Sequence, residues 1–420
     1  MRHQKLNDLS MHCRPIALWT LAGICAIVLS TAASALGGDD IFAPPHVAKL
    51  KSVTSVAGSP NGQYVAYTLS VPRNPMKEAN GSAWSELHVV DAKGNSRPFV
   101  TGNVSVSGVQ WTPDGRGMAF TSKRADDEQT SLYVVPVDGG EARVAVAHNA
   151  SLHGVAYSVD GKKIAFLATE PVPKSLQEFK DKGFNQEIYE EDWRPTKVWI
   201  AAADGSDKPR ALGIEGSASQ VRWSPSGRQL AVVLAPTPLV DDGYMFKRVS
   251  IVDADTGRIV ERIPNPGKLG QVGWSPDGKH LAMISGIDIN DPSDGRLMVT
   301  AVPGAPSDEG LRDLMPDYQA HVKSFAWKDD KTLLWQAAEG TATTVGTVEL
   351  SGKTARLIDA EGPVLGGMSL SDDGRATAFV GHTPQHPGEV FLLDERGKQT
   401  RRLTDVNPWL EKMRFAKQQV

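Results

Sequence analysis

Short apolar runs, each following a polar turn, recur along most of this chain. In "WSPDGKHLAMI", which begins at Trp274, an aromatic residue precedes a Ser-Pro-Asp-Gly turn and an apolar run follows the turn. Apolar runs of this length bounded by Gly, Pro and Asp are typical of β-strands. The pattern therefore predicts a β-hairpin at this position.

The same turn occurs in seven copies. Proline sets the dihedral of the first turn position, aspartate suits the next, and glycine adopts the left-handed conformation that closes a three-residue hairpin. Because so many copies cannot all be active sites, we interpret the motif as structural. The copies are "GSPNGQYVAYT" at Gly58, "WTPDGRGMAF" at Trp111, "YSVDGKKIAFLA" at Tyr157, "WSPSGRQLAVV" at Trp223, "WSPDGKHLAMI" at Trp274, "WKDDKTLLWQA" at Trp327 and "LSDDGRATAFV" at Leu370.

Most copies are followed by a second apolar run that ends in an acidic or Gly-rich turn, such as "RVSIVDADTGR" from Arg248. Two hairpins per repeat give four strands, at a period near the 40 to 50 residues typical of propeller blades. We therefore predict an all-β fold, a seven-bladed β-propeller of four-stranded antiparallel blades. An open β-solenoid or two sandwiches would not require such uniform units.

The aromatic residue before the turn occupies one slot in the repeat. A large flat ring fits the gap between adjacent tilted sheets, so we expect these side chains to pack in the core. They are Trp111, Tyr157, Trp223, Trp274 and Trp327.

Two segments break the repeat. Lys174–Pro195 is charged, with apolar residues at a loosely helical spacing, and Ala235–Arg248 is a second enlarged loop. Inserted loops on rigid scaffolds often carry recognition, so we expect any binding function to lie in these insertions. The alternative is a solvated surface insertion without a function.

The N-terminus has the pattern of an export signal. Basic residues precede the apolar run "IALWTLAGICAIVLSTAA", and the small residues "ASA" follow it. We interpret residues 1–35 as a signal peptide cleaved after Ala35, which places the protein in the periplasm or outside the cell. The alternative is an uncleaved membrane anchor. Both cysteines, Cys13 and Cys25, lie in this segment, so the mature chain would have no disulfide.

Composition and motifs exclude several classes. The 40 Gly and 27 Pro residues fit a turn-rich globular protein, and the net charge of −4 offers no basic footprint for nucleic acid. "DINDPSDG" from Asp288 lacks the glutamate that a calcium loop requires at its twelfth position. His382 and His386 have a zinc-like spacing, but neighbouring prolines forbid a helix, so we expect loop residues. We expect no metal and no cofactor.

The repeats, the opening "APPHVAKLKSVTSVAGSPNGQYVAYTLS" and the segment "RRLTDVNPWLE" resemble the N-terminal propeller of the prolyl oligopeptidase family of serine peptidases, in its acylaminoacyl-peptidase and dipeptidyl-aminopeptidase-like bacterial branch. In that family such a segment leads into an α/β-hydrolase domain. The resemblance implies a propeller over residues 36–405 and a linker over residues 406–420 toward a hydrolase domain.

The nucleophile elbow of that family, Gly-x-Ser-x-Gly, occurs nowhere in the 420 residues. Without an elbow and an oxyanion hole we expect no acyl transfer, so this sequence contains no catalytic residue that can be named. We interpret the chain as a substrate-gating propeller portion of an exported peptidase. Its partners would be peptides or a protein, including a separate hydrolase domain, with no membrane contact after signal cleavage.

Dipeptidyl aminopeptidases of this family hold the substrate amine with paired glutamates in a Tyr-Glu-Glu context. The resemblance implies this role for Glu190 and Glu191 in "IYEEDW", although about thirty residues separate the pair from the next Trp-Ser-Pro motif. Tyr244 and Arg248 could add an aromatic face and a carboxylate fork. The alternative function is a periplasmic protein- or peptide-binding propeller similar to that of the Tol-Pal system.

Overall fold

A computed structural model describes residues 40–418, except 125, 303–309, 360–361 and 394–397. The chain divides into two compact units. Ala48–Pro408 form the larger one, and the segments on either side of it form the smaller one. The expected signal peptide, residues 1–35, lies outside the described residues.

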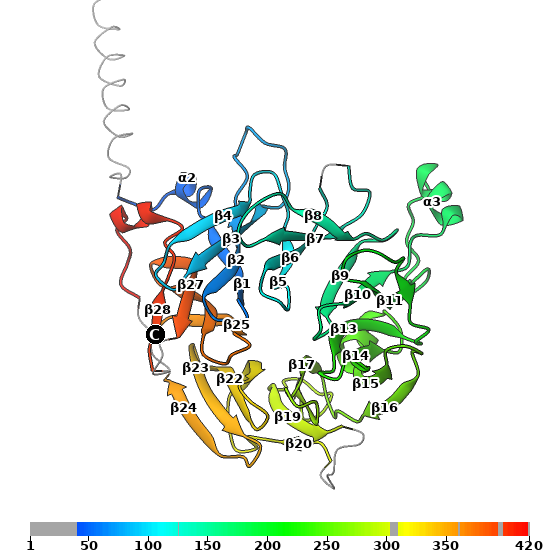
Figure 1. Cartoon of the computed structure of the whole chain (residues 1–420). Helices are drawn as coiled ribbons and strands as arrows, with labels where there is room; N and C mark the ends of the chain where they lie inside the picture. The colour runs from blue at the N-terminus through cyan, green and yellow to red at the C-terminus, as the bar shows by residue number, and fades with distance from the viewer. Residues whose placement is uncertain (1–39, 125, 303–309, 360–361, 394–397, 419–420) are drawn as a thin grey trace, which may run out of the picture. The chain divides into compact units, whose positions relative to one another are not determined.

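The larger unit consists of seven four-stranded antiparallel sheets, each built from four consecutive strands (Figure 1). This confirms the predicted seven-bladed propeller. Blade 1 comprises β1 (Ser52–Gly58), β2 (Tyr64–Val71), β3 (Trp84–Asp91) and β4 (Ser96–Val100). Blade 2 comprises β5 (Ser107–Trp111), β6 (Gly117–Ser122), β7 (Ser131–Pro136) and β8 (Arg143–Val146). Blade 3 comprises β9 (Leu152–Tyr157), β10 (Lys163–Thr169), β11 (Thr196–Ala202) and β12 (Arg210–Ala211).

Blades 4 to 7 repeat this arrangement. Blade 4 comprises β13 (Ser217–Trp223), β14 (Gln229–Ala235), β15 (Arg248–Asp253) and β16 (Ile259–Ile263). Blade 5 comprises β17 (Leu269–Trp274), β18 (His280–Ser285), β19 (Arg296–Ala301) and β20 (Arg312–Asp313). Blade 6 comprises β21 (His321–Trp327), β22 (Thr332–Glu339), β23 (Ala342–Glu349) and β24 (Thr354–Ile358). Blade 7 comprises β25 (Val364–Leu370), β26 (Thr377–Thr383), β27 (His386–Leu393) and β28 (Thr400–Arg402).

The first strand of each blade lies at the centre of the ring. Each first strand contacts the first strands of both neighbouring blades, and β1 contacts β25, which completes the circle (Figure 1). The buried apolar residues form seven clusters, and each cluster joins two adjacent blades. The hydrophobic core is therefore divided among the seven blade interfaces.

The repeated tryptophans connect neighbouring blades by hydrogen bonds. Trp111, Trp223 and Trp274 are buried, as predicted, while Trp327 and Tyr157 are half-buried. In each Trp case the indole Nε1 donates to a backbone carbonyl of an earlier inner strand. The acceptors are Ala57 at 2.9 Å for Trp111, Ala156 at 3.1 Å for Trp223, Arg222 at 3.2 Å for Trp274 and Gly273 at 3.1 Å for Trp327.

The Ser-Pro-Asp-Gly turn differs from the expected three-residue hairpin. The Ser275 N–H donates to the carbonyl of His280, so four residues lie between the two members of this hydrogen-bonded pair. The Ser275 hydroxyl donates to Asp277 Oδ1 at 2.7 Å and accepts the N–H of His280 at 2.9 Å. Gly278 adopts φ +70°, which glycine tolerates without strain. Serine therefore takes the place of a backbone acceptor, and this allows the longer turn.

The ring closes without a strand shared between its ends, because blade 1 contains only β1–β4 and blade 7 only β25–β28. Polar contacts join the two blades. Ser369 Oγ accepts the N–H of Gly58 at 2.9 Å. The buried amide of Asn407 accepts the N–H of Lys51 at 2.9 Å and donates to the carbonyl of Lys51 at 2.7 Å.

The smaller unit is described for residues 40–47 and 409–418. Phe42 stacks on Trp409 at a ring distance of 6.2 Å, and the Arg414 N–H donates to the carbonyl of Asp40 at 2.7 Å. Its short helix is α2 (Pro44–Val47), and the 3-10 helix η1 (Pro408–Lys412) spans the division between the units.

The interpretation of His382 and His386 as loop residues was wrong. His382 lies in β26 and His386 begins β27, on either side of a tight turn. The prolines exclude a helix but not this hairpin, because the Thr383 hydroxyl bonds His386 Nδ1 at 2.8 Å and the His386 N–H at 3.1 Å.

Candidate functional site

The first insertion leaves blade 3 between its second and third strands. At its base the hydroxyls of Thr169 and Thr196 lie 2.8 Å apart, and Arg194 Nη1 donates to the carbonyl of Glu170 at 2.6 Å. The apolar spacing indicated a helix, and α3 (Lys174–Asp181) confirms it (Figure 1). These contacts hold the two ends of the insertion against the blade.

The second insertion leaves blade 4 at the equivalent place, between β14 and β15. It contains a short helix, α4 (Val240–Met245), which the sequence analysis did not predict. Asp242 Oδ2 accepts the Thr237 hydroxyl at 2.6 Å and its N–H at 2.9 Å, which fixes the entry to α4.

The two insertions come from adjacent blades and interact electrostatically. The charge of Glu190, its hydrogen bond and the charge of Asp241 raise the pKa of the Tyr189 phenol above its ordinary value. Asp241 belongs to α4, so one carboxylate of the second insertion acts on a side chain of the first. Glu190 and Glu191 are both exposed, and Glu190 has φ +60°, which is an uncommon conformation for glutamate.

The remaining two candidates lie on the second insertion. Tyr244, in α4, is 65% exposed, so its ring can contact a ligand. Arg248 is half-buried, and its Nη1 donates to the carbonyls of Met245 at 3.3 Å and Lys247 at 2.8 Å. Arg248 therefore holds its own loop in the present arrangement.

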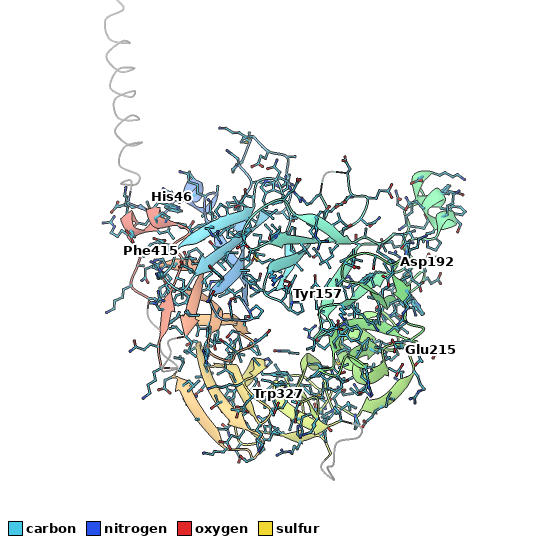
Figure 2. The ribbon with its side chains drawn as sticks, viewed as in Figure 1. His46, Tyr157, Asp192, Glu215, Trp327 and Phe415 are labelled. Atoms are coloured by element: carbon cyan, nitrogen blue, oxygen red, sulfur yellow. The ribbon has the colours of Figure 1, made fainter. Side chains whose placement is uncertain are left out.

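The insertions also carry an exposed aromatic surface that the sequence analysis missed. Among the described residues, every large aromatic side chain classed as exposed lies on these two segments, and together they define what we call the aromatic surface: Phe179, Phe184, Tyr189, Trp193, Tyr244 and Phe246. Phe179 and Phe184 contact each other edge to face at 6.0 Å. Large exposed apolar patches mark binding sites on soluble proteins. Figure 2 shows Asp192, which precedes Trp193 in the sequence, at the outer side of the ring.

Two clefts occur where the repeated tryptophan is replaced. Tyr157 lines a cleft of about 640 Å³ between blades 2 and 3, beside Arg116 and Arg143. Desolvation raises the pKa of Tyr157 to about 12. Leu370 lines a second cleft of about 790 Å³, where blade 7 meets blade 6. A smaller residue in the tryptophan slot fills less of the gap between blades, and comparing this position across the repeats could have located both clefts.

The fold defines a seven-bladed β-propeller with insertions on two adjacent blades and no shared closing strand. Its solved structural neighbours are propellers of prolyl oligopeptidase-family peptidases. An acylaminoacyl peptidase bound to a chloromethyl ketone matches with a TM-score of 0.65 at 14% identity, over 87% of this chain and 54% of that chain. A puromycin-hydrolyzing peptidase of Mycobacterium tuberculosis matches with a TM-score of 0.62 at 14% identity, over 85% and 54%. This chain thus spans about half the length of these peptidases.

A propeller domain solved alone is also similar. The β-propeller domain of the Trilobed protease from Pyrococcus furiosus, described as having an open velcro topology, matches with a TM-score of 0.60 at 14% identity, over 86% of this chain and 97% of that domain. At these identities, the structural matches show the fold alone. Among curated proteins, the uncharacterized peptidase YuxL of Bacillus subtilis is 33% identical over 106 residues, which is 25% of this chain and 14% of that protein. No family model matches.

Within the described residues, no helix has the length and apolar character needed to cross a membrane.

Proposed function

We propose that this chain is the substrate-gating propeller portion of an exported serine peptidase of the prolyl oligopeptidase family. The similarity to acylaminoacyl-peptidase propellers over 87% of the chain is the observation that carries the proposal. Its partner is then a hydrolase domain that supplies the nucleophile, and this chain supplies a ring that admits peptides and excludes folded proteins.

The first test concerns catalysis by the chain alone. We expect no hydrolysis of acyl-peptide or aminoacyl esters and no reaction with a fluorophosphonate probe, because the sequence offers no nucleophile elbow. Chymotrypsin in the same assay serves as the positive control. Stoichiometric labelling of a serine in this chain would contradict the assignment of catalysis to a partner domain.

The second test concerns the gate. A dye-labelled unstructured peptide should bind the purified chain, as measured by fluorescence anisotropy, whereas the same segment inside a folded protein should not. Equal binding of both forms would mean that the ring does not select by chain conformation. Export is tested separately by the mass of the mature protein, which should begin at Leu36.

Within this function, Glu190 and Glu191 serve as a subsite for the free amine of a peptide. Both carboxylates are exposed, and the charge of Asp241 acts on the same loop through Tyr189. Replacing both glutamates by glutamine should weaken binding of a free-amine peptide and leave its N-acetylated form unchanged in calorimetry. Glu178→Gln and Glu187→Gln, in the same insertion, form the matched control. Unchanged affinity for the free-amine peptide would exclude this subsite.

The aromatic surface favours a second function, that of a propeller that binds a protein or peptide without a hydrolase. In that case the double substitution Tyr189→Ala and Trp193→Ala should abolish peptide binding, because exposed aromatic side chains would supply most of the contact area. If the peptide instead binds at the centre of the ring, the same double variant should retain peptide binding.

A further inference from the structure

The inner strands of the ring have an unbalanced charge. The seven strands β1, β5, β9, β13, β17, β21 and β25 contain no Asp or Glu. Their basic residues are His153, Arg222, His321 and Lys323. Solvated surfaces normally mix both signs, and the net charge of the chain is −4, so a purely basic set of central strands is unusual for this protein.

Two basic side chains of the central strands reach solvent although protein atoms surround them. Arg222 and His153 are exposed, yet surrounding protein atoms lower the pKa of both groups through desolvation. A side chain that contacts solvent and is nevertheless desolvated lies in a space with protein on several sides.

We call the seven inner strands the inner wall. Its arginine and its lysine have no acidic side chain as an ion-pair partner. Arg222 lies on β13 of blade 4, and its Nη1 donates only to the carbonyl of Val221, at 3.0 Å. Lys323 lies on β21 of blade 6 and is exposed. In the described part of the chain, no carboxylate lies within ion-pair distance of either side chain. At Arg222, desolvation without a compensating charge raises the affinity for an external anion.

The wall between the two cations is neutral and held in place. Gln220 donates to the carbonyl of Gly270 at 2.7 Å, and Gln271 donates to the carbonyl of Phe325 at 2.7 Å. These amides tie blades 4, 5 and 6 together along their inner strands. The cations therefore project from a rigid frame.

The positions of the cations indicate the form of the ligand. Arg222 directly precedes the aromatic residue of its repeat, whereas Lys323 lies four residues before Trp327. At a rise of about 3.3 Å per residue, shortened by the β-bulge at Lys323, this offset of three positions places the two residues at most about 10 Å apart along the strand direction. An extended chain with two carboxylates can span this offset.

We propose that the inner wall binds the carboxylates of extended peptides through Arg222 and Lys323. The carboxylates come from acidic side chains or from a free C-terminus, which share the same chemistry. The proposal goes beyond the gating function, because it concerns binding to this chain alone and holds whether or not a hydrolase domain accompanies it.

Calorimetry with four short peptides tests the proposal and separates the two sources. The first peptide is acetylated and amidated and carries two glutamates three positions apart, and the second carries glutamines instead. The third is the glutamine peptide with a free C-terminus, and the fourth is the glutamate peptide with a free C-terminus. We expect the first peptide to bind at least about tenfold more tightly than the second at low salt, and half a molar salt to remove most of this difference. Tighter binding of the third than of the second would show that a terminal carboxylate also suffices.

Variants locate the site. Arg222→Gln and Lys323→Gln should each weaken binding of the first peptide by about fivefold to tenfold and leave the second unchanged, in line with partly desolvated charge pairs. Lys208→Gln, an exposed cation on the loop before β12, is the matched control and should have no effect. Far-UV circular dichroism confirms that each variant is folded.

Three results would overturn the proposal. The first is equal affinity for the glutamate and glutamine peptides. The second is a loss of affinity in Lys208→Gln as large as that in the Arg222 and Lys323 variants. The third is no binding of any glutamate peptide at millimolar concentration. The first two would attribute binding to the peptide backbone or to the general surface charge. The peptide-against-folded-protein test of the gate is independent of all three results.

Discussion

Replacing Trp274 by alanine tests whether the repeated aromatic residue holds adjacent blades together. Trp274 is 9% exposed and packs in the cluster that joins blades 4 and 5, with Leu281 and Met283 among its members. Truncation of a large aromatic side chain in a core costs about 3 to 5 kcal/mol. We therefore expect the free energy of unfolding of Trp274→Ala to fall by about this amount.

Trp274→Phe separates the packing from the hydrogen bond. Phenylalanine keeps a large apolar ring but cannot donate to the carbonyl of Arg222, which Trp274 Nε1 contacts at 3.2 Å. The loss of one hydrogen bond that leaves its acceptor unpaired costs about 1 to 3 kcal/mol. The phenylalanine variant should thus lie between the wild type and the alanine variant.

Urea denaturation followed by tryptophan fluorescence and circular dichroism measures these differences. Trp193→Ala is the control, because Trp193 is 48% exposed on the first insertion and its loss should change stability by less than about 0.5 kcal/mol. A loss below about 1 kcal/mol in Trp274→Ala would refute the assignment of this ring to the interface between blades. A phenylalanine variant as unstable as the alanine variant would make the hydrogen bond, and not the packing, the main contribution.

Two further predictions concern the closure of the ring and a buried acid. Asn407→Ala removes both hydrogen bonds to the backbone of Lys51 and should lower the free energy of unfolding by about 2 kcal/mol. Asn103→Ala, at an exposed position, is the control and should leave stability unchanged. Equal stability of the two variants in urea would exclude a role of Asn407 in closing the ring. Desolvation raises the pKa of the fully buried Glu389 above its ordinary value of 4.5. The stability that the protonated form contributes is therefore complete below pH 4.5, and it is lost as the pH rises through the raised pKa. Glu389→Gln should flatten the decline of stability above pH 4.5 in thermal melts, and an unchanged slope would assign the decline to other groups.

The sequence predicted the fold more completely than the site. Seven copies of one turn, each with an aromatic or apolar residue before it, define the blades without any knowledge of the long-range contacts. The predicted length of the turn was wrong because the hydroxyl of Ser275 replaces a backbone acceptor. Side-chain hydrogen bonds of this kind do not follow from dihedral preferences alone. The proximity of Tyr189 and Asp241 could not be predicted, because it depends on how two irregular loops fold over neighbouring blades.

Arg222 illustrates a signal that was present in the sequence but not recognised. It precedes the aromatic residue of blade 4, where the other blades have alanine, glycine, glutamine or serine. Within one repeat the residue is an ordinary surface arginine. Only the ring arrangement shows that this exposed arginine lies on one of the seven central strands.

The closing contact between blades 1 and 7 also has a consequence for how the chain folds. Each sheet is made of consecutive strands, so paired strands are neighbours in the sequence, and individual hairpins can form quickly. The hydrogen bonds of Asn407 with Lys51 join residues 356 positions apart. The entropy cost of closing such a loop must be met before any contact at this junction contributes. Ring closure should therefore be a late event in folding, so that substitutions at Asn407 speed unfolding while leaving the formation of the separate blades almost unchanged.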